Sequence, residues 1–403
     1  MGMEFRPYYF GREWAKMGHR VDIIAADFSH IRRKNPIVAY DFDTEDIDGI
    51  TYHWVKTRKY SGNGAARAVT MIEFVSKLRR NAKRIIDECD PDIILCSSTY
   101  PLDTYAGQKL RRVSGRAKLI HEAHDMWPAT LVEIGKMART NPFVVMMQIA
   151  ENSAYRNSDY VISMAPYTED YMKDHGLADG KWIHVPLGID MNEWRERKPL
   201  SEDHMKHFRK LHDDGNFVVG YFGGLALSNA MDNFLDIASI FLRKDEKASF
   251  VIVGKGVEKE HLMRRVEDEG LTNVSFLPPV SKKEIPELTA QMDCIYMGAN
   301  ATSLYRFGLC LNKMADSMMA QRPVLCAITA PPTWVDIAGC GITTDSANAG
   351  QAAGAIKKIM DMTEEERRAM AVNGRRYAEQ NLDIKKLAER TADLFMSLNG
   401  GEK

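Results

Sequence analysis

The sequence has no apolar run long enough to cross a membrane. A spanning helix needs about 20 consecutive, mostly apolar residues, and no stretch of the 403 residues approaches that length. We therefore predict a cytoplasmic protein. Any contact with a membrane would be peripheral, on the inner face of the plasma membrane.

Cysteine is scarce, and charge of either sign is almost balanced. The six cysteines form no C-x-x-C pair and show no histidine spacing typical of zinc, so we interpret them as buried thiols in a reducing compartment and predict no metal site. The formal net charge is -1, which argues against a general nucleic-acid-binding protein. We predict no nucleic-acid partner.

Short apolar runs alternate with longer amphipathic stretches along the whole chain. Examples are 21–25, 93–96, 160–163, 218–222, 250–253 and 324–327. Alternation of buried strands and helices is typical of α/β folds with parallel, doubly wound sheets. The pattern occurs twice, and the polar segment 190–215 separates its two halves. The sequence therefore predicts two α/β domains.

The stretch 305–325 carries the densest set of candidate ligand groups. It contains a glycine turn, a helix whose first turn holds Asn312, Lys313 and Asp316, and a buried strand entered through Pro323. Residues three and four apart share one face of a helix, so these side chains can converge on one ligand. The helix N-terminus and Lys313 suit a phosphate, and the Asp316 carboxylate suits a sugar diol. Spacing alone fits a capped helix with a Lys–Asp surface pair equally well.

This stretch resembles the donor-binding segment of glycosyltransferase family four, whose members are retaining enzymes of the GT-B fold. The family element ends in "EAMA.G.PV", and residues 316–324 (DSMMAQRPV) hold that place. The resemblance implies that Asp316 contacts the nucleotide ribose. Position 308, where the family has its first acid, is glycine. The chain is similar to the N-acetyl-fucosaminyltransferase-like subgroup, which builds bacterial surface polysaccharides.

The resemblance also implies two Rossmann-like domains that face a cleft. The N-terminal domain, 1–190, would bind the acceptor and would be joined by a crossing helix at 382–403, whereas 191–381 would bind the nucleotide-sugar donor. The opening residues 2–9 (GMEFRPYY) match only the tail of the family's glycine-rich first loop. We therefore expect that the first strand of the N-terminal domain is missing, and that the chain is truncated or begins inside the true reading frame.

Two glycines after an apolar strand form a further candidate element of the donor site. Gly223 and Gly224 would let the backbone approach a diphosphate closely, although a tight turn needs glycine anyway. The family's Arg and Lys just beyond this loop are absent. Because a leaving diphosphate needs positive charge, we predict that Lys313, Arg306 and Lys255 supply it. An exposed turn lysine explains Lys255 at least as well, and a surface salt bridge is the alternative for Arg306.

The base of the nucleotide is predicted to lie beside residues 273–280. This segment, which ends at Val280, resembles the family strand and loop whose backbone holds the base. Backbone recognition places no demand on side chains, so the residues do not identify the base. Uridine is the expectation by analogy with similar polysaccharide enzymes.

His124 and Asp125 are the candidate catalytic residues. They follow a predicted strand at 118–120, in a segment, 121–128 (HEAHDMWP), that resembles the subgroup's "RDLWPE" with His124 in place of arginine. The carboxyl ends of parallel strands face the crevice where ligands bind. Alternatively, Asp125 only caps the next helix. Because the first family acid is absent, we favour a same-face substitution that needs no metal and no cofactor beyond the nucleotide sugar.

Basic residues in the first half indicate the acceptor. Residues 65–86 combine apolar positions with arginines and lysines, which suits an anionic membrane surface and a polyprenyl-diphosphate-linked acceptor. Arg32 is a candidate ligand of the same diphosphate, and Arg6 in the opening motif is the second predicted acceptor-binding residue. A core helix with a solvated basic face is the commoner explanation of such a pattern.

These patterns predict a retaining hexosyltransferase. It would move a sugar from a nucleotide-diphosphate donor, expected to be UDP-linked, to a saccharide or lipid-linked acceptor in bacterial surface polysaccharide synthesis. Two alternatives stay open: a nucleotide-sugar epimerase of GT-B-like fold, and a catalytically impaired nucleotide-binding subunit. A dinucleotide dehydrogenase is less favoured, because no complete G-x-G-x-x-G follows a first strand.

Overall fold

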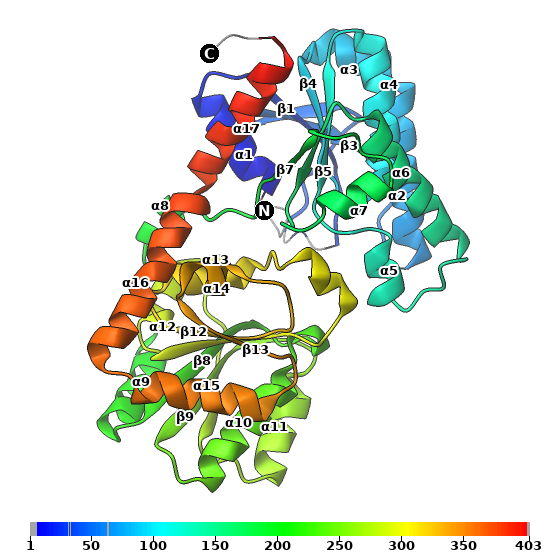
Figure 1. Cartoon of the computed structure of the whole chain (residues 1–403). Coiled ribbons are helices and arrows are strands. Elements are labelled where there is room, and N and C mark those ends of the chain that lie inside the picture. Colours follow the sequence, from blue (N-terminus) through cyan, green and yellow to red (C-terminus); the bar gives the residue numbers. More distant parts are fainter. Residues whose placement is uncertain (1–5, 31, 33, 63, 401–403) are drawn as a thin grey trace. The chain divides into compact units, whose positions relative to one another are not determined.

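The chain divides into two compact units (Figure 1). The computed structural model describes residues 6–30, 32, 34–62 and 64–400. Unit 1 comprises Met1–Gly188 together with Ile384–Lys403, and unit 2 comprises Ile189–Asp383. These boundaries lie within a few residues of those expected from the sequence. No helix in the described part of the chain combines the length and the apolar character needed to cross a membrane.

Unit 2 is built on one parallel sheet of six strands in the order β10-β9-β8-β11-β12-β13. Strands β9, β11 and β12 are buried along almost their whole length, which is why they are continuous apolar runs in the sequence. The elements of unit 2 are α8 (Met191–Arg195), α9 (Glu202–Asp213), β8 (Phe217–Gly224), η2 (Leu227–Asn229), α10 (Met231–Arg243), β9 (Ala248–Lys255), α11 (Lys259–Asp268), β10 (Val274–Leu277), η3 (Lys282–Glu284), α12 (Ile285–Thr289), β11 (Cys294–Gly298), η4 (Ser303–Phe307), α13 (Asn312–Met319), β12 (Val324–Ala327), α14 (Trp334–Ala338), β13 (Gly341–Thr344), α15 (Ala349–Asp361) and α16 (Glu364–Asn381).

Helices cover both faces of this sheet. One face packs against α10, α11 and α15, and the other packs against α9, α12, α13, α14 and α16. Because the strands are parallel, their carboxyl ends lie at one edge of the sheet. β8 ends there at Gly224, β9 at Lys255 and β11 at Gly298. The fold therefore gathers the segments that follow these strands at a common edge.

Unit 1 contains two sheets where one parallel sheet was expected. Their strand orders are β1-β3-β2 and β4-β5-β6-β7. The elements of unit 1 are α1 (Arg6–Lys16), β1 (Val21–Ala26), β2 (Asp43–Ile47), β3 (Ile50–Val55), α2 (Ala65–Arg80), α3 (Ala82–Cys89), β4 (Ile93–Cys96), η1 (Pro101–Asp103), α4 (Thr104–Ser114), β5 (Lys118–Ala123), α5 (Ala129–Glu133), α6 (Pro142–Asn157), β6 (Tyr160–Ser163), α7 (Glu169–Asp174), β7 (Trp182–His184) and α17 (Ile384–Leu398).

The two sheets of unit 1 share one apolar core. Within the described residues, β1 pairs only with β3 and β4 pairs only with β5. Ile24 and Ala26 of β1 nevertheless pack against the same apolar cluster that contains Ile94 and Cys96 of β4. The hydrogen-bonded layer is thus interrupted between β1 and β4, whereas the core continues across the interruption. Residues 1–5, which carry part of the expected opening motif, lie outside the described residues.

An antiparallel hairpin joins β2 and β3, and the prediction of parallel sheets did not include it. Its turn is formed by Asp48 and Gly49, with φ of 53° and 82°. Asp-Gly is typical of a two-residue type I′ turn, in which both central residues have positive φ. The sequence signal for this hairpin is therefore present, at 47–50.

The basic stretch 65–86 folds as two helices, α2 and α3, which meet at Asn81. Asn81 Nδ2 donates a hydrogen bond to Lys77 O at 2.9 Å, and the same carbonyl also accepts from the backbone N–H of Asn81 at 3.1 Å. Thr70, Phe74 and Leu78 are among the buried residues of α2. One side of α2 therefore belongs to the core of unit 1.

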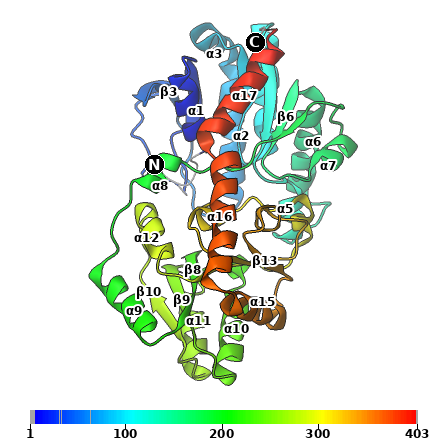
Figure 2. The same cartoon turned by 60° about the vertical axis from the view of Figure 1, so that its left-hand side comes forward.

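Helix α17 returns to unit 1 and lies beside α1 in both views (Figure 1; Figure 2). Trp14 Nε1 donates to Ala388 O at 3.0 Å, and the Trp14 ring lies 5.3 Å from that of Phe395. Ile384 and Leu387 are buried with Phe10 in one cluster. The last helix of the chain thus completes the core of its first unit.

Candidate functional site

Lys313 and the two glycines that end β8, Gly223 and Gly224, lie together in unit 2. Gly223 has φ of 139°, and a Cβ added there would lie 2.8 Å from Lys313 Cδ, so glycine suits this approach. Lys313 Nζ donates to Tyr221 Oη at 2.8 Å and to Asn229 Oδ1 at 3.2 Å. Gly224 O accepts hydrogen bonds from the side chains of Tyr221 and Asn229. These bonds join the start of α13 to the turn as one site.

The ammonium of Lys313 is partly shielded from water. Burial lowers the pKa of Lys313 to about 8, because desolvation disfavours the charged form. The group is therefore mostly protonated at neutral pH. A cation beside a glycine turn at the carboxyl edge of a parallel sheet is suited to a phosphate group.

Asp316 lies on the same helix, three residues beyond Lys313, and is half-buried. Its carboxylate accepts no hydrogen bond from the side chains or backbone of the described residues. Burial raises the pKa of Asp316 to about 6, against the opposing charge of Lys282. The carboxylate can therefore accept hydrogen bonds from a ligand hydroxyl.

The other predicted donor residues of unit 2 lie in varied surroundings. Asn312 is the first residue of α13 and is exposed, as is the side chain of Lys255 at the end of β9. The guanidinium of Arg306 is exposed and lies 4.2 Å from the ring centre of Phe307, within its own turn. Val280 follows β10 and packs against an apolar cluster. Their roles in binding a donor stay predictions.

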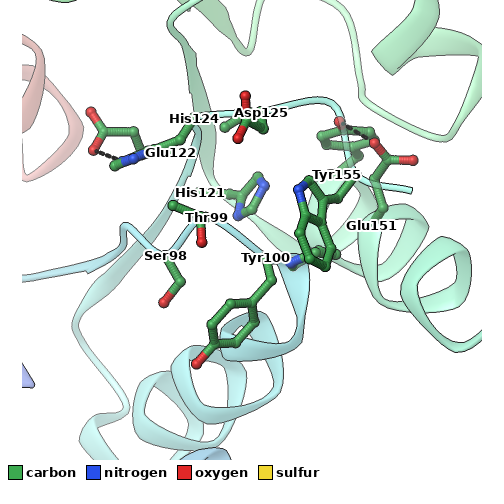
Figure 3. A pocket seen from close by; sticks show the side chains of 12 residues that line it. Ser98, Thr99, Tyr100, His121, Glu122, His124, Asp125, Glu151 and Tyr155 are labelled. Carbon is green, nitrogen blue, oxygen red and sulfur yellow. Dashed lines mark hydrogen bonds and ion pairs between the residues drawn. The ribbon is translucent and has the colours of Figure 1, made fainter. Parts of the chain in front are cut away.

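His124 lies directly after β5 in unit 1, where it contacts a buried acid. His124 Nε2 is 2.9 Å from Glu122 Oε2 and 3.0 Å from Ser97 Oγ. Ser97 Oγ donates to the same carboxylate oxygen at 2.6 Å. Figure 3 shows the contact between His124 and Glu122 beside Asp125, whose side chain is exposed. Asp125 is therefore accessible, and its catalytic role stays a prediction.

The structure places Arg6 in the interior, where it was expected to bind the acceptor. Arg6 is 6% exposed. Its guanidinium donates to Glu122 Oε1 at 2.9 Å, to Pro186 O at 2.7 Å and to Val185 O at 3.1 Å. The N–H groups of a buried guanidinium must hydrogen-bond to protein acceptors, because no water reaches them. Arg6 is thus a partner of Glu122, and the acceptor-binding interpretation is corrected.

Glu122 and Ser97 were not among the site residues predicted from the sequence. Glu122 lies in β5, where the residues 119–123 are all buried, and a charged residue in such a strand needs a partner. That signal could have singled out Glu122, whereas nothing in the sequence around Ser97 indicates a role for it.

The pKa of Glu122 reflects its charged and hydrogen-bonded partners. Burial alone would raise this pKa, yet the charge of Arg6 and the hydrogen bonds from His124 and Ser97 hold the pKa well below its usual range.

A recess beside the His124 loop has a cavity volume of only about 10 Å³ (Figure 3). His121 Nδ1 is buried there without a hydrogen-bond partner among the described residues, and burial lowers the pKa of His121 to about 4. Burial raises the pKa of Glu151 to about 7, although Tyr171, Tyr155 and Gln148 hydrogen-bond to it. The recess is smaller than most small-molecule pockets, which span about 300–1,000 Å³. It extends the surroundings of His124 rather than forming a separate ligand pocket.

Arg32 is bound to its own loop. Its guanidinium donates to Ala26 O at 3.1 Å and to Asp27 O at 3.3 Å, and it lies 5.4 Å from the ring centre of Trp54. The side chain is half-buried. A role in binding the acceptor stays a prediction for Arg32.

Asp22, His53 and Cys89 form a group of potential metal ligands within the described residues. His53 Nε2 lies 2.8 Å from Asp22 Oδ1 and 3.8 Å from Cys89 Sγ. Arg20 also pairs with Asp22 at 3.0 Å. These atoms already have protein partners, and the prediction that the chain uses no metal stays a prediction.

Family comparisons cover both units of the chain. The family model described as "Glycosyltransferase Family 4" matches residues 2–193, and the model described as "Glycosyl transferases group 1" matches residues 203–377. The chain belongs to glycosyltransferase family four. The predicted family is thereby confirmed. Within family four, the predicted N-acetyl-fucosaminyltransferase-like subgroup stays a prediction.

One curated relative of this family-four chain is WcaI of Escherichia coli (strain K12), described as a colanic acid biosynthesis glycosyl transferase. The two are 24% identical over 144 residues. The matched part spans 36% of this chain and 35% of the relative's length. The similarity therefore concerns only about a third of each protein.

Solved structures of similar fold cover nearly the whole family-four chain. Sucrose-phosphate synthase from Thermosynechococcus elongatus is 16% identical, with a TM-score of 0.70 over 96% of this chain and 91% of that one. WaaG, a glycosyltransferase involved in lipopolysaccharide biosynthesis, is 16% identical, with a TM-score of 0.62 over 98% and 96%. Anabaena HepE in complex with UDP is 18% identical, with a TM-score of 0.63 over 86% of each chain. The predicted GT-B fold, with two Rossmann-like units, is confirmed.

Proposed function

We propose that this family-four protein transfers a sugar from a nucleotide-diphosphate donor to a saccharide or lipid-linked acceptor. The observation that carries the proposal is the contact of Lys313 with the Gly223 turn, with the unused carboxylate of Asp316 on the same helix. One helix then offers a cation and N–H groups to the diphosphate and a carboxylate to the ribose. We propose UDP as the nucleotide of the donor, because the similar structure of HepE has been solved with UDP and with UDP-glucose.

The proposed reaction is a same-face substitution with retention. Glycine at position 308 stands where the family has its first acid, so no carboxylate is singled out as a covalent nucleophile. The departing diphosphate would then help to take the acceptor proton, while Lys313 and the N-terminus of α13 stabilise its charge. This route requires no metal, because protein groups supply the positive charge.

The proposed acceptor is linked to a lipid and reached at an anionic membrane surface, as in the synthesis of a bacterial surface polysaccharide. Val69 and Ile72 on α2 are 46% and 45% exposed, and Arg79 and Arg80 on the same helix are exposed too. Exposed apolar and basic side chains on one helix suit such a surface. The cations at 77, 83 and 84, in contrast, are paired with Asp41, Asp87 and Glu88.

A transfer assay tests the proposal. The protein is incubated with each of a panel of nucleotide sugars, with and without a polyprenyl-diphosphate-linked saccharide, and the products are identified by mass spectrometry and by the anomeric coupling in NMR. Transfer with retention supports the proposal. An epimer formed without acceptor would favour an epimerase, and stabilisation by UDP without any product would favour an impaired nucleotide-binding subunit.

A further inference from the structure

Four polar side chains form a connected, largely buried chain of contacts in unit 1: Arg6, Glu122, Ser97 and His124. The side chains of Arg6 and Glu122 are only 4% and 5% exposed, and that of His124 is 14% exposed. Each oxygen of the Glu122 carboxylate has a separate task. Oε1 accepts from Arg6, and Oε2 accepts from Ser97 and contacts His124.

Counting hydrogens decides which nitrogen of His124 carries one. An ionised carboxylate can only accept, so its contact with His124 Nε2 at 2.9 Å requires a hydrogen on that nitrogen. Ser97 has a single hydroxyl hydrogen, and the 2.6 Å bond to Glu122 uses it. The 3.0 Å contact between Ser97 Oγ and Nε2 therefore also needs the hydrogen of Nε2. Both neighbours require the same tautomer.

The other ring nitrogen of His124 is then left with a lone pair. In neutral imidazole one nitrogen donates and the other accepts. Nδ1 of His124 makes no hydrogen bond to a described residue, and it is not among the buried atoms that lack a partner. It is therefore accessible to a ligand as an acceptor.

We propose that Glu122, paired with Arg6, is a positioning residue that fixes the hydrogen of His124 on Nε2 and presents Nδ1 to a substrate hydroxyl group. The ligand class is a sugar whose hydroxyl donates to Nδ1. The assignment of the tautomer stands on the geometry of unit 1 alone, whereas the sugar as ligand rests on the proposed transferase function. Arg6 acts on His124 only through Glu122. Its hydrogen bonds to Pro186 O and Val185 O fix the guanidinium that pairs with the Glu122 carboxylate.

The tautomer can be measured on the isolated protein by NMR of ring nitrogens in 15N-histidine-labelled samples. The chain has 11 histidines, and His124→Asn assigns the signal by its loss. At a pH where His124 is neutral, the wild type should show the hydrogen on Nε2. A wild-type His124 that carries its hydrogen on Nδ1 would overturn the inference, whatever the activity of the protein.

Matched variants separate positioning from a purely structural salt bridge. Glu122→Asp keeps a charge for Arg6 but withdraws the carboxylate from Nε2, so a mixture of tautomers is expected in a folded protein. Ser97→Ala removes another hydrogen bond of the same group but leaves the Glu122 contact, so the wild-type tautomer should persist. Glu122→Gln is the less informative change, because it leaves the buried Arg6 without a counter-charge and can prevent folding. Unchanged tautomers in folded Glu122→Asp would contradict the proposal.

Kinetics supply the second readout. With an active donor and acceptor pair, Glu122→Asp should lower kcat about 2- to 10-fold, because only the fraction of His124 that keeps its hydrogen on Nε2 presents Nδ1 as an acceptor. The KM for the nucleotide sugar should change much less. A tautomer shift without loss of kcat would refute the role of Nδ1. If the wild type transfers no sugar with any substrate but shows the Nε2 tautomer, the proposed function fails and the positioning of His124 stands.

Discussion

Asp316 and Lys313 lie on the same helix, and burial shifts the pKa of each toward neutrality. The pKa of Asp316 rises to about 6, and that of Lys313 falls to about 8. The proposed binding of a nucleoside diphosphate needs both groups charged, because in that proposal the carboxylate accepts from the ribose and the ammonium faces the phosphates. We therefore expect the affinity for UDP to rise as the pH increases through about 6 and to fall above about 8. Calorimetry from about pH 5 to pH 9 measures the affinity for UDP, and an affinity that does not change with pH would contradict the assigned site.

Asp316→Asn should weaken UDP binding about 10- to 100-fold at pH 7.5, because it removes a charged hydrogen-bond acceptor. The carboxylate is protonated below its pKa of about 6. The difference between variant and wild type should therefore shrink as the pH falls toward 5. Glu267→Gln, an exposed acid on α11 of the same unit, is the control and should bind UDP like the wild type.

Lys313→Met should separate diphosphate recognition from fold stability. The variant loses the cation beside Gly223, so UDP should bind at least about tenfold more weakly, whereas uridine should bind almost as before. The free energy of unfolding should change little, because the variant also avoids the cost of burying an ammonium group. Binding of both ligands and thermal unfolding are measured together. Equal weakening of UDP and uridine would show that Lys313 does not contact the phosphates.

Single residues were predictable where backbone geometry alone sets their place. Gly223 lies at the end of strand β8 and Lys313 in the first turn of helix α13, and both positions lie at the carboxyl edge of one parallel sheet. Their meeting follows from that topology. Arg6 could not be placed in this way, because its partner Glu122 is 116 residues away in the sequence. No local pattern encodes a pairing across that separation.

Among the elements, β1 and β4 are expected to be unlike the strands of unit 2. Each pairs on one side only within the described residues, and all six residues of β1 are partly exposed. Backbone N–H groups on the unpaired sides should exchange with solvent faster than those of β9, which is paired on both sides. Hydrogen–deuterium exchange resolves this by segment. Protection of β1 equal to that of β9 would mean that its second side is covered in solution.

Helix α2 is expected to drive attachment to anionic vesicles. Arg79→Glu combined with Arg80→Glu should abolish flotation with phosphatidylserine-containing liposomes, because each basic residue near such a surface contributes about 1 kcal/mol. The control is an equal charge reversal on α9, Lys206→Glu with Arg209→Glu, since both residues are exposed in unit 2. If the α2 and α9 variants bind alike, the basic face of α2 is only a solvated surface.

The alternation of apolar runs predicted most strands, but not every pairing. Strand β3 has the Asp48-Gly49 turn before it, and turn chemistry rather than periodicity determines that it pairs antiparallel to β2. Likewise, the basic pattern of 65–86 did not indicate the break at Asn81, where the side chain donates a second hydrogen bond to Lys77 O beside the one from its own backbone N–H. Both differences arise from local polar groups that hydrophobic periodicity does not register.

At the scale of the whole molecule, the two units should differ in their dependence on the chain ends. Unit 2 is one continuous segment, Ile189–Asp383, with its own apolar clusters. A fragment of these residues should therefore unfold cooperatively and still bind UDP. A fragment ending at residue 188 lacks α17, and the buried side chains of Ile384 and Leu387 alone contribute about 3–6 kcal/mol. Such a loss is comparable with the total stability of a domain, about 5–15 kcal/mol.

Circular dichroism during heating tests this difference between the fragments. The segment 189–383 should give a sharp transition, whereas 1–188 should give a broad one or none. Adding a synthetic α17 peptide, 384–400, should restore a cooperative transition to the first fragment. A stable 1–188 fragment whose thermal transition does not change when the peptide is added would show that α17 contributes little to the core. The two-domain organisation was predictable because each half repeats the same strand and helix pattern, but the partnership of α1 with α17 depends on residues far apart in the sequence, as between Trp14 and Phe395.

Because the final helix belongs to the first unit, synthesis on the ribosome cannot complete the units in the order in which they begin. The apolar side of α1 stays uncovered by α17 while unit 2 is translated, which takes roughly 10–40 s at typical rates of synthesis. During that interval Phe10 and Trp14 have no covering helix. The nascent chain should therefore be a client for chaperones until its last turn of helix leaves the exit tunnel.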